Sequence, residues 1–280
     1  MVYLGKQNKN NIKMKTKIFL LFALSALLYS CDLVDAQVVW LSTKNPDFSN
    51  CDREERTVKE FEGIRNTCPF DVYYEQSDEQ YVIVEGDEEY FDRLHTTVSH
   101  GILEITIDPA RYRNVRLRVK VGSPDITLLA MAGSGSLQCP KNIVTDDDLS
   151  LSLAGSGDLI AEKIKCADIS IAVSGSGDLN VASIEADDVN MSLAGSGDLD
   201  AVRLKANNVS ISLAGSGDID VINASIQEDL YASVAGSGDI SVSGHARNVT
   251  AKIAGSGDIS GRLSYEKISK TRAGSGDIDW

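Results

Sequence analysis

The chain has 280 residues, of which 42% are hydrophobic and only 6% aromatic, and its formal net charge at pH 7 is −14. The apolar content is sufficient for a core, and the scarcity of aromatic residues favours a narrow aliphatic core over a broad globular one. The negative charge argues against nucleic acid as a partner, because binding the phosphate backbone requires a basic surface.

Residues 1–30 have the features of an export signal. Lysines precede an apolar run over residues 18–28, which is too short to cross a bilayer comfortably. The run ends at Leu28-Tyr29-Ser30-Cys31, which resembles the lipobox of bacterial lipoproteins, although Tyr29 is bulkier than the small residue usual there. We predict a signal peptide with a lipobox and lipidation of Cys31. A plain signal peptide or a poorly inserted anchor is the alternative.

The charge outside this segment bears on where the protein resides. Residues 1–30 contain five lysines and no acidic residue, so their removal leaves a net charge of −19. An anionic membrane surface repels such a chain, and attachment must therefore come from several acyl chains. We predict an exported protein, lipid-anchored in the bacterial cell envelope at the outer membrane; whether it faces the periplasm or the exterior stays open. Translation could also start at Met14.

The next two segments differ in pattern. Residues 31–55 are polar and irregular, and we predict a flexible tether there. Residues 56–125 contain β-branched and aromatic runs separated by acidic or Gly/Pro breaks, and only residues 88–94 suggest a helical period. The predicted strands cover residues 70–74, 81–84, 102–107 and 115–121. This region should form degenerate coils or a cap of the repeats that follow.

Five cysteines allow several arrangements. Cys51 and Cys68 flank a short polar segment and are a candidate disulfide in an oxidising compartment. Cys139 and Cys166 lie in neighbouring repeats, and the connectivity is not deducible. No cysteine spacing matches a zinc site, and we predict no metal and no cofactor.

Residues 126–280 are built from a repeat. The pentad Gly-Ser-Gly-Asp-hydrophobic occurs seven times at steps of 19 to 21 residues, and a degenerate copy at residues 133–137 lacks the aspartate. A fixed period of this length indicates structural units that stack on one another, because one unit alone cannot bury its apolar face. The first glycines of the pentads are Gly155, Gly175, Gly195, Gly215, Gly236, Gly255 and Gly274.

Period two continues through each pentad. Val209, Ile211 and Leu213 share one phase with Gly215 and Gly217, and the opposite phase is polar or small. Alternate side chains of a strand point to opposite faces, so one face is core and the other is solvated. Glycines on the inward phase suit a sharp bend or a close approach of two backbones.

A second column of turn-forming residues completes the repeat. Asp and Asn favour turns because their side chains bond to nearby backbone N–H groups. We predict an all-β, single-stranded β-helix-like solenoid of about 20 residues per coil, each coil being strand, glycine corner, strand and second turn. The second-turn residues are Asp148, Asp168, Asp188, Asn208, Asp229 and Asn248.

Several segments resemble a known family. They are residues 56–64 (RTVKEFEGI), 70–72 (FDV) and 82–87 (VIVEGD), together with the serial Ala-Gly-Ser-Gly-Asp-Leu/Ile units. This combination resembles the auto-transporter adhesin head GIN domain family, a family of unknown function in bacterial secreted lipoproteins. The resemblance covers about residues 55–280. It implies a β-helix-like solenoid and a surface role, and it supplies no catalytic residues.

The aspartates of the pentads form a candidate ligand ladder. Stacked carboxylates about 5 Å apart repel by roughly 1 kcal/mol per pair even in water, so something must compensate. The first interpretation is that each accepts backbone N–H bonds at its corner; the others are calcium bound between coils and a shared, raised carboxylate pKa. The ladder comprises Asp158, Asp178, Asp198, Asp218, Asp239, Asp258 and Asp277.

The remaining candidates for catalysis are weak. The pentad serines would need a neighbouring base, but the three histidines, His95, His100 and His245, do not recur with the repeat. Some β-helical enzymes cleave acidic polysaccharides with Asp and Lys or Arg on one face, but the basic residues here are scattered. Active sites usually interrupt a repeat with a long loop, and these coils vary by only one or two residues. We predict no catalytic residues and no enzyme.

Trp280 shares the phase of the core positions in the last repeat. A large ring there would cover the open end of the solenoid as an end cap, and the alternative is that this end docks a partner or a second copy.

We predict a non-catalytic cell-envelope lipoprotein that acts in adhesion, interaction or scaffolding. Its expected partners are the membrane, through the lipid anchor, and a surface glycan or protein, with homo-oligomers left open. A carbohydrate- or calcium-binding module using the aspartate column is the first alternative, and a polysaccharide-processing enzyme is the second.

Overall fold

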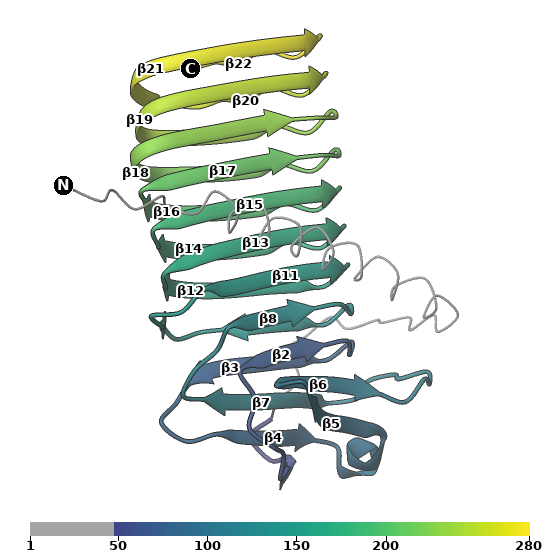
Figure 1. Ribbon diagram of the computed structural model, residues 1–280. Coiled ribbons are helices and arrows are strands. Elements are labelled where there is room, and N and C mark those ends of the chain that lie inside the picture. Colours follow the sequence, from purple (N-terminus) through teal and green to yellow (C-terminus); the bar gives the residue numbers. More distant parts are fainter. Residues whose placement is uncertain (1–47) are drawn as a thin grey trace, which may run out of the picture. The chain divides into compact units, whose positions relative to one another are not determined.

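The computed structural model describes residues 48–280, which form a stack of β-strand coils (Figure 1). The predicted all-β solenoid is confirmed, with about eight turns of roughly 20 residues. The predicted signal, Cys31 and most of the tether lie outside the described residues. None of the helices among residues 48–280 is long and apolar enough to cross a membrane.

Each coil of the repeats contributes two strand segments, one on each side of the glycine corner. In register, β13 lies on β11 with Gly175 opposite Gly155, and β14 lies on β12 with Leu179 opposite Leu159. The strands are β8 (Leu128–Met131), β9 (Ser136–Cys139), β10 (Ile143–Val144), β11 (Leu149–Gly155), β12 (Asp158–Lys165), β13 (Asp168–Gly175), β14 (Leu179–Glu185), β15 (Asp188–Gly195), β16 (Leu199–Ala206), β17 (Asn208–Leu213), β18 (Ile219–Val234), β19 (Ile240–Gly255), β20 (Ile259–Ser260), β21 (Leu263–Gly274) and β22 (Ile278–Asp279).

The change of coil length by one residue is absorbed locally. β18 and β19 run straight through the second turn, and their parallel pairing shifts register twice, between Val221 and Ala224 and between Ile226 and Asp229. Such irregularities accommodate an extra residue without breaking the ladder on either side. The glycine corners therefore stay in line along the stack although the steps between them vary.

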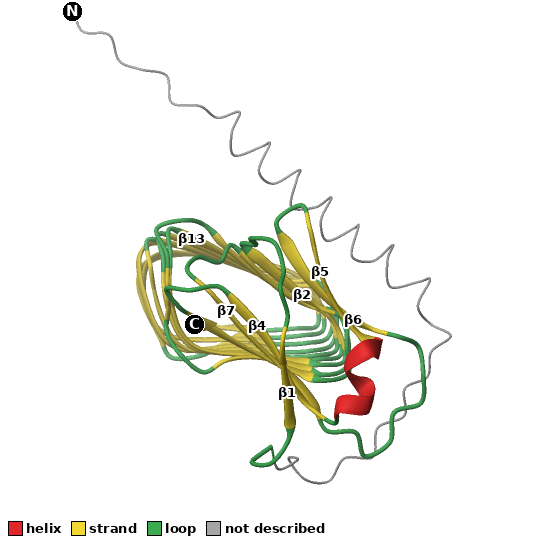
Figure 2. Cartoon of the chain, turned by 90° about the horizontal axis from the view of Figure 1, so that it is seen from below, coloured by secondary structure: helices red, strands yellow, loops and turns green. Residues whose placement is uncertain are grey.

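The alternation of apolar residues produces a continuous core. Val209, Ile211, Leu213 and Ile219 are each at most 3% exposed, and the equivalent residues of the other coils stack above and below them. Burying one such aliphatic side chain stabilises the fold by about 1.5–3 kcal/mol relative to leaving it exposed. Viewed along the axis, the strands of successive coils lie over one another, as do the corners that join them (Figure 2).

Some of the N-terminal strands continue the stack of coils, and others close its end. They are β1 (Asp52–Glu55), β2 (Gly63–Asn66), β3 (Asp71–Gln76), β4 (Tyr81–Gly86), the 3-10 helix η1 (Glu88–Arg93), β5 (Leu94–Ser99), β6 (Ile102–Ile107) and β7 (Leu117–Ser123). β2 and β3 form a coil that pairs in parallel with β8 and β9 on one side and with β6 and β7 on the other. β4 and β5 then pair antiparallel with β7 and β6 and close this end (Figure 1).

One boundary differs from the expectations, and the one expected helical period is present. Residues 52–55, which we assigned to the tether, form β1, paired antiparallel with β4. β1 pairs with the edge of β4 that β7 does not occupy. The helical period at residues 88–94 corresponds to η1, whose Phe91 is buried against the core.

Candidate functional site at the stacked corners

The glycine corner is compact because the backbones of successive coils touch there. A Cβ atom built on Gly177 would overlap the carbonyl oxygen of Gly157, and one on Gly175 would overlap that of Gly155. Gly175 also has a φ of +138°, which favours glycine. The N–H groups of Ser176 and Gly177 both donate to the Gly155 carbonyl oxygen, at 2.9 and 3.1 Å. Both roles expected for the two glycines are present.

The pentad aspartates line up on the outer side of this corner. In five successive steps, Oδ1 of one aspartate accepts a bond from the backbone N–H of the aspartate in the next coil, at 2.7 to 3.1 Å. The residue after each aspartate from Asp158 to Asp258 donates its N–H to the next aspartate's carbonyl oxygen, as from Leu179 to Asp198 at 2.9 Å. This is the geometry of the first interpretation, in which backbone donors offset the repulsion between carboxylates. The donors engage one carboxylate oxygen per residue.

Repulsion remains where a second carboxylate joins the ladder. Burial, followed by the charges of Asp220, Asp198 and Asp178, raises the pKa of Asp200. Burial and the neighbouring Asp178 raise the pKa of Asp158, and a backbone hydrogen bond partly opposes this. Among residues 48–280 no group of three or more His, Cys, Asp or Glu side chains is arranged to hold a metal ion.

The second turn carries its own ladder, in which asparagines relieve the aspartates. Asn208 Nδ2 donates to Asp188 Oδ1 at 2.9 Å, and Asn248 Nδ2 donates to Asp229 Oδ1 at 2.8 Å. Where aspartate follows aspartate, the backbone N–H of Asp188 donates to Asp168 Oδ1 at 3.1 Å. The residues predicted for this turn thus bond between coils as well as shaping the turn itself.

Beside this turn, a carboxylate lies between two lysines. Glu185 accepts a bond from Lys205 at 3.3 Å and lies 3.5 Å from Lys165. The hydrogen bond from Lys205 and the charges of both lysines lower the pKa of Glu185. These exposed pairs contribute little to stability and mainly balance charge along the stack.

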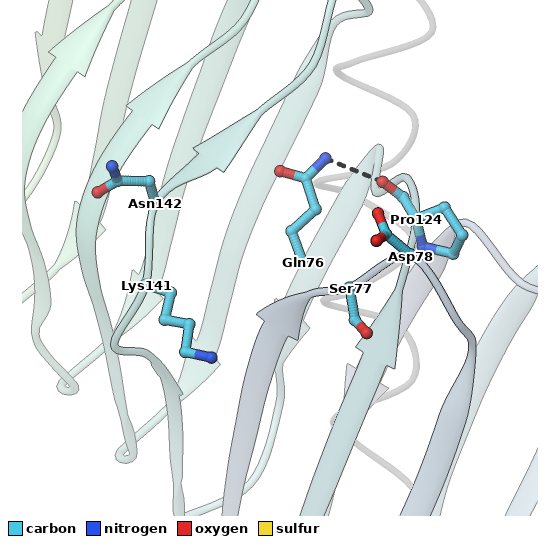
Figure 3. Close-up of a pocket in the computed structure, with 6 residues that line it drawn as sticks. All are labelled: Gln76, Ser77, Asp78, Pro124, Lys141 and Asn142. Atoms are coloured by element: carbon cyan, nitrogen blue, oxygen red, sulfur yellow. Dashed lines mark hydrogen bonds between the residues drawn. The ribbon is translucent and has the colours of Figure 1, made fainter.

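A polar hollow of about 560 Å³ lies where the cap meets the first repeat (Figure 3). Gln76 occupies its edge: the side-chain Nε2 donates to the carbonyl oxygens of Pro124 and Val144 at 2.9 and 2.8 Å, and Oε1 accepts from Val144 N–H at 2.9 Å. The amide thereby substitutes for a missing strand beneath β10. Lys141, on the rim, pairs with Glu75 at 2.7 Å. The bonds made here by Gln76 and Lys141 join the cap to the solenoid.

The cysteines considered for a disulfide do not pair in the structure. Cys68 is fully buried after β2, whereas Cys51 precedes β1 and donates its Sγ–H to Phe48 O. The two residues belong to different layers, because β2 pairs with β6 and β8 whereas β1 pairs with β4. Burial also raises the pKa of the Cys139 thiol to about 12, which makes it a poor nucleophile.

The serines of the pentads are exposed, and serine–histidine contacts lie elsewhere: Ser99 Oγ is 2.9 Å from Nδ1 of the adjacent His100, and a second contact lies in the last coils. His245 Nδ1 is 3.0 Å from Ser264 Oγ, on the outer face. Ser264 donates its own proton to Gly244 O, so the imidazole must donate to the hydroxyl and cannot act as its base. The contact is therefore unlike an activated nucleophile.

The last described coil differs from those beneath it. Trp280 is partly buried and packs against the core, and its Nε1 donates to the carbonyl oxygen of Ser260. Tyr265 Oη donates to the backbone oxygen of Trp280 at 2.9 Å. The ring therefore contacts the coil beneath, and its role as an end cap stays a prediction.

The chain matches a known protein family. A family model described as "Putative auto-transporter adhesin, head GIN domain" matches residues 60–246, from just before β2 into β19. The chain belongs to this family. No curated protein matches it.

Solved structures resemble this head GIN domain chain over most of its length. A structure from Parabacteroides distasonis, titled a putative lipid binding protein, is 29% identical with a TM-score of 0.72, over 82% of this chain and 96% of that one. A putative adhesin from the same species is 20% identical with a TM-score of 0.69, over 82% and 96%. A putative adhesin from Bacteroides fragilis is 22% identical with a TM-score of 0.65, over 82% and 97%.

Three features of this head GIN domain chain were missed by the sequence reasoning. Asp200 and Asp220 extend the ladder sideways, and their spacing, two residues after a pentad aspartate, was the available signal. Lys270 and Arg272 stand in register with core residues of the coil beneath. The available signal was the period of two, because both residues share the phase of Gly274. The Gln76 bonds to β10 had no local signal, since they join residues 68 positions apart.

Proposed function

We propose that this protein is a non-catalytic, exported lipoprotein whose solenoid serves as a rigid rod in adhesion, interaction or scaffolding at the bacterial cell envelope. The supporting observation is that the polar groups of the corners bond to one another between coils. Backbone N–H groups of one coil donate to aspartate oxygens of another, so these groups hold the coils in register. Coils of 19 to 21 residues leave no long loop in the repeats to build a catalytic cleft.

Two measurements test the anchor and the exposure. With Cys31→Ser the protein should move from the membrane fraction to the soluble fraction after cell lysis, because its lipid attachment is lost. Treatment of intact cells with a protease should degrade the wild-type rod if it faces outward, with a known periplasmic protein as the protected control. Protection equal to that control would end the adhesin interpretation and leave an envelope scaffold.

A carbohydrate- or calcium-binding role for the aspartate column is the second candidate. It is favoured by the second oxygen of each carboxylate and by the added carboxylates of Asp200 and Asp220. Calcium should then raise the melting temperature at millimolar concentration, and Asp198→Asn/Asp218→Asn should abolish the rise and any glycan-array binding. Equal behaviour of the wild type and the double variant would remove this role.

A lipid ligand is a third candidate, because one similar structure is titled a putative lipid binding protein. Stacked aliphatic side chains fill the coil interior, so a lipid would bind outside, where Val202 and Ile222 are 38% and 53% exposed on adjacent coils. Co-sedimentation of Cys31→Ser protein with phosphatidylcholine vesicles should then fall with Val202→Ser/Ile222→Ser. The absence of co-sedimentation would exclude a lipid surface.

A further inference from the structure

The last described coil places charges where the repeat coils beneath it, back to β8, have buried apolar residues. Lys270 is in register with Ala251, and Arg272 is in register with Ile253. Ala251 and Ile253 are at most 2% exposed, whereas the lysine and arginine above them are exposed. Period two is kept, so both long side chains stand on the core-facing phase of the last described coil.

Lys270 reaches across the coil to residues 278–280, and Arg272 reaches the pentad corner of its own coil. Lys270 Nζ donates to the backbone oxygens of Ile278 and Trp280 at 3.1 and 2.9 Å. Arg272 Nη1 donates to Asp277 Oδ1 at 2.8 Å and to Gly276 O at 3.4 Å. These bonds tie β21 to the pentad corner and to the final segment of the same coil. Trp280 packs against the core beside them.

Without these side chains, this end would expose a strand edge that can pair with another strand. β21 is a strand of 12 residues at the edge of the stack, and such an edge offers a template for another strand. A second copy stacked on this end would bury the lysine and arginine charges, strip them of water and break the bonds that they make within the coil. We infer that Lys270 and Arg272 prevent a second copy of this chain from stacking on the solenoid end. This inference does not depend on what the rod binds.

The structure of the opposite end limits how two copies without these charges could associate. There β4 and β5 run antiparallel to β7 and β6, so that end does not continue the parallel coil. Without the charges, two copies should meet β21 to β21 across a two-fold axis and stop at a dimer.

The test replaces the two residues with those of the coil beneath. Lys270→Ala/Arg272→Ile, in Cys31→Ser protein, should form a dimer in analytical ultracentrifugation, with a dissociation constant at least about 100-fold below that of the unsubstituted protein. A spin label on Thr271→Cys, with Cys51→Ser to remove the accessible thiol, should show a short label-to-label distance in this dimer. Circular dichroism shows whether the fold is retained.

Two controls separate charge removal from position. Arg262→Ala/Lys267→Ala removes two positive charges from exposed positions of the same coil and should leave the protein monomeric. Lys270→Arg/Arg272→Lys keeps the charges and should also be monomeric. A folded Lys270→Ala/Arg272→Ile protein that stays monomeric at about 100 μM would overturn the inference, as would dimers whose labels lie far apart. If that variant does not fold, Lys270→Ala/Arg272→Ala is judged by the same two readouts.

Discussion

At the scale of single residues, the two glycines of a pentad are constrained by the carbonyl groups of the coil beneath. The second glycine is buried, and its missing side chain leaves room for the carbonyl oxygen of its counterpart. Because that neighbour is backbone, it cannot rotate away as a flexible side chain could. Each pentad glycine is therefore a point at which the separation of two coils is set.

Gly197→Ala should destabilise the protein by about 2–3 kcal/mol, because the new methyl group overlaps Gly177 O and forces two coils apart. The urea midpoint measured by circular dichroism gives the effect. Ser196→Ala, at the exposed neighbouring position, is the control and should change the midpoint by no more than about 0.5 kcal/mol in stability. Equal effects of the two substitutions would contradict close packing of the corner.

Asp200→Asn should raise the melting temperature at pH 7 by about 1 °C. Burial and three neighbouring aspartates raise the pKa of Asp200 in the folded protein, so ionisation of this side chain is less favourable there than in the unfolded chain. Ionisation of Asp200 therefore costs stability at neutral pH, and this cost disappears as the pH falls below about 4. Asp279→Asn, whose register partner is Ser260, is the control and should give a smaller gain.

At the scale of elements, the aspartate ladder is a set of hydrogen bonds between neighbouring coils. Asp218 illustrates it: Oδ1 accepts the N–H of Asp239, and its own N–H donates to Asp198. An asparagine can keep the acceptor while removing the charge, and an alanine can keep neither. The pair of substitutions separates bonding from repulsion.

Asp218→Ala should lower stability by about 1 kcal/mol, because the N–H of Asp239 loses its partner. Asp218→Asn should be neutral or slightly stabilising at pH 7, since the acceptor remains and one repulsive charge is gone. Urea denaturation of both variants measures the difference. A loss with asparagine as large as with alanine would mean that the charge itself holds the coils together.

The pattern along the chain predicted the repeats well and the cap poorly. Alternation such as Val209-Ser210-Ile211 and the pentad glycines are local signals, so strand phase, corner and coil length could be read without a partner strand. The position of β2 and β3 between β6–β7 and β8–β9 depends on pairing between distant segments, which no local pattern records. The pairing geometry of the aspartate oxygens likewise appears only when coils are stacked.

At the scale of the whole molecule, stability is distributed over interfaces between neighbouring coils. Deleting residues 176–195 removes one complete coil and joins Gly175 to Ser196, so every remaining contact has an equivalent. The shortened protein should fold, with the circular dichroism spectrum of a β protein and a modestly lower urea midpoint.

A deletion of half a coil is the matched control. Removing residues 176–185 eliminates a glycine corner and one strand, and it puts the following residues on the wrong side of the coil. This variant should lose cooperative unfolding or aggregate. If both deletions are tolerated alike, the coils are not the units of stability.

The placement of the first coil governs the order in which this protein can acquire its structure. Val72 pairs with Val119 and with Leu137, whereas later coils pair with segments about 20 residues away. A chain that emerges from its N-terminus must wait for residue 139 before that layer has neighbours on both sides, and long loop closures of this kind are slow. We therefore expect this layer to form slowly and each later turn to add to the coils already folded.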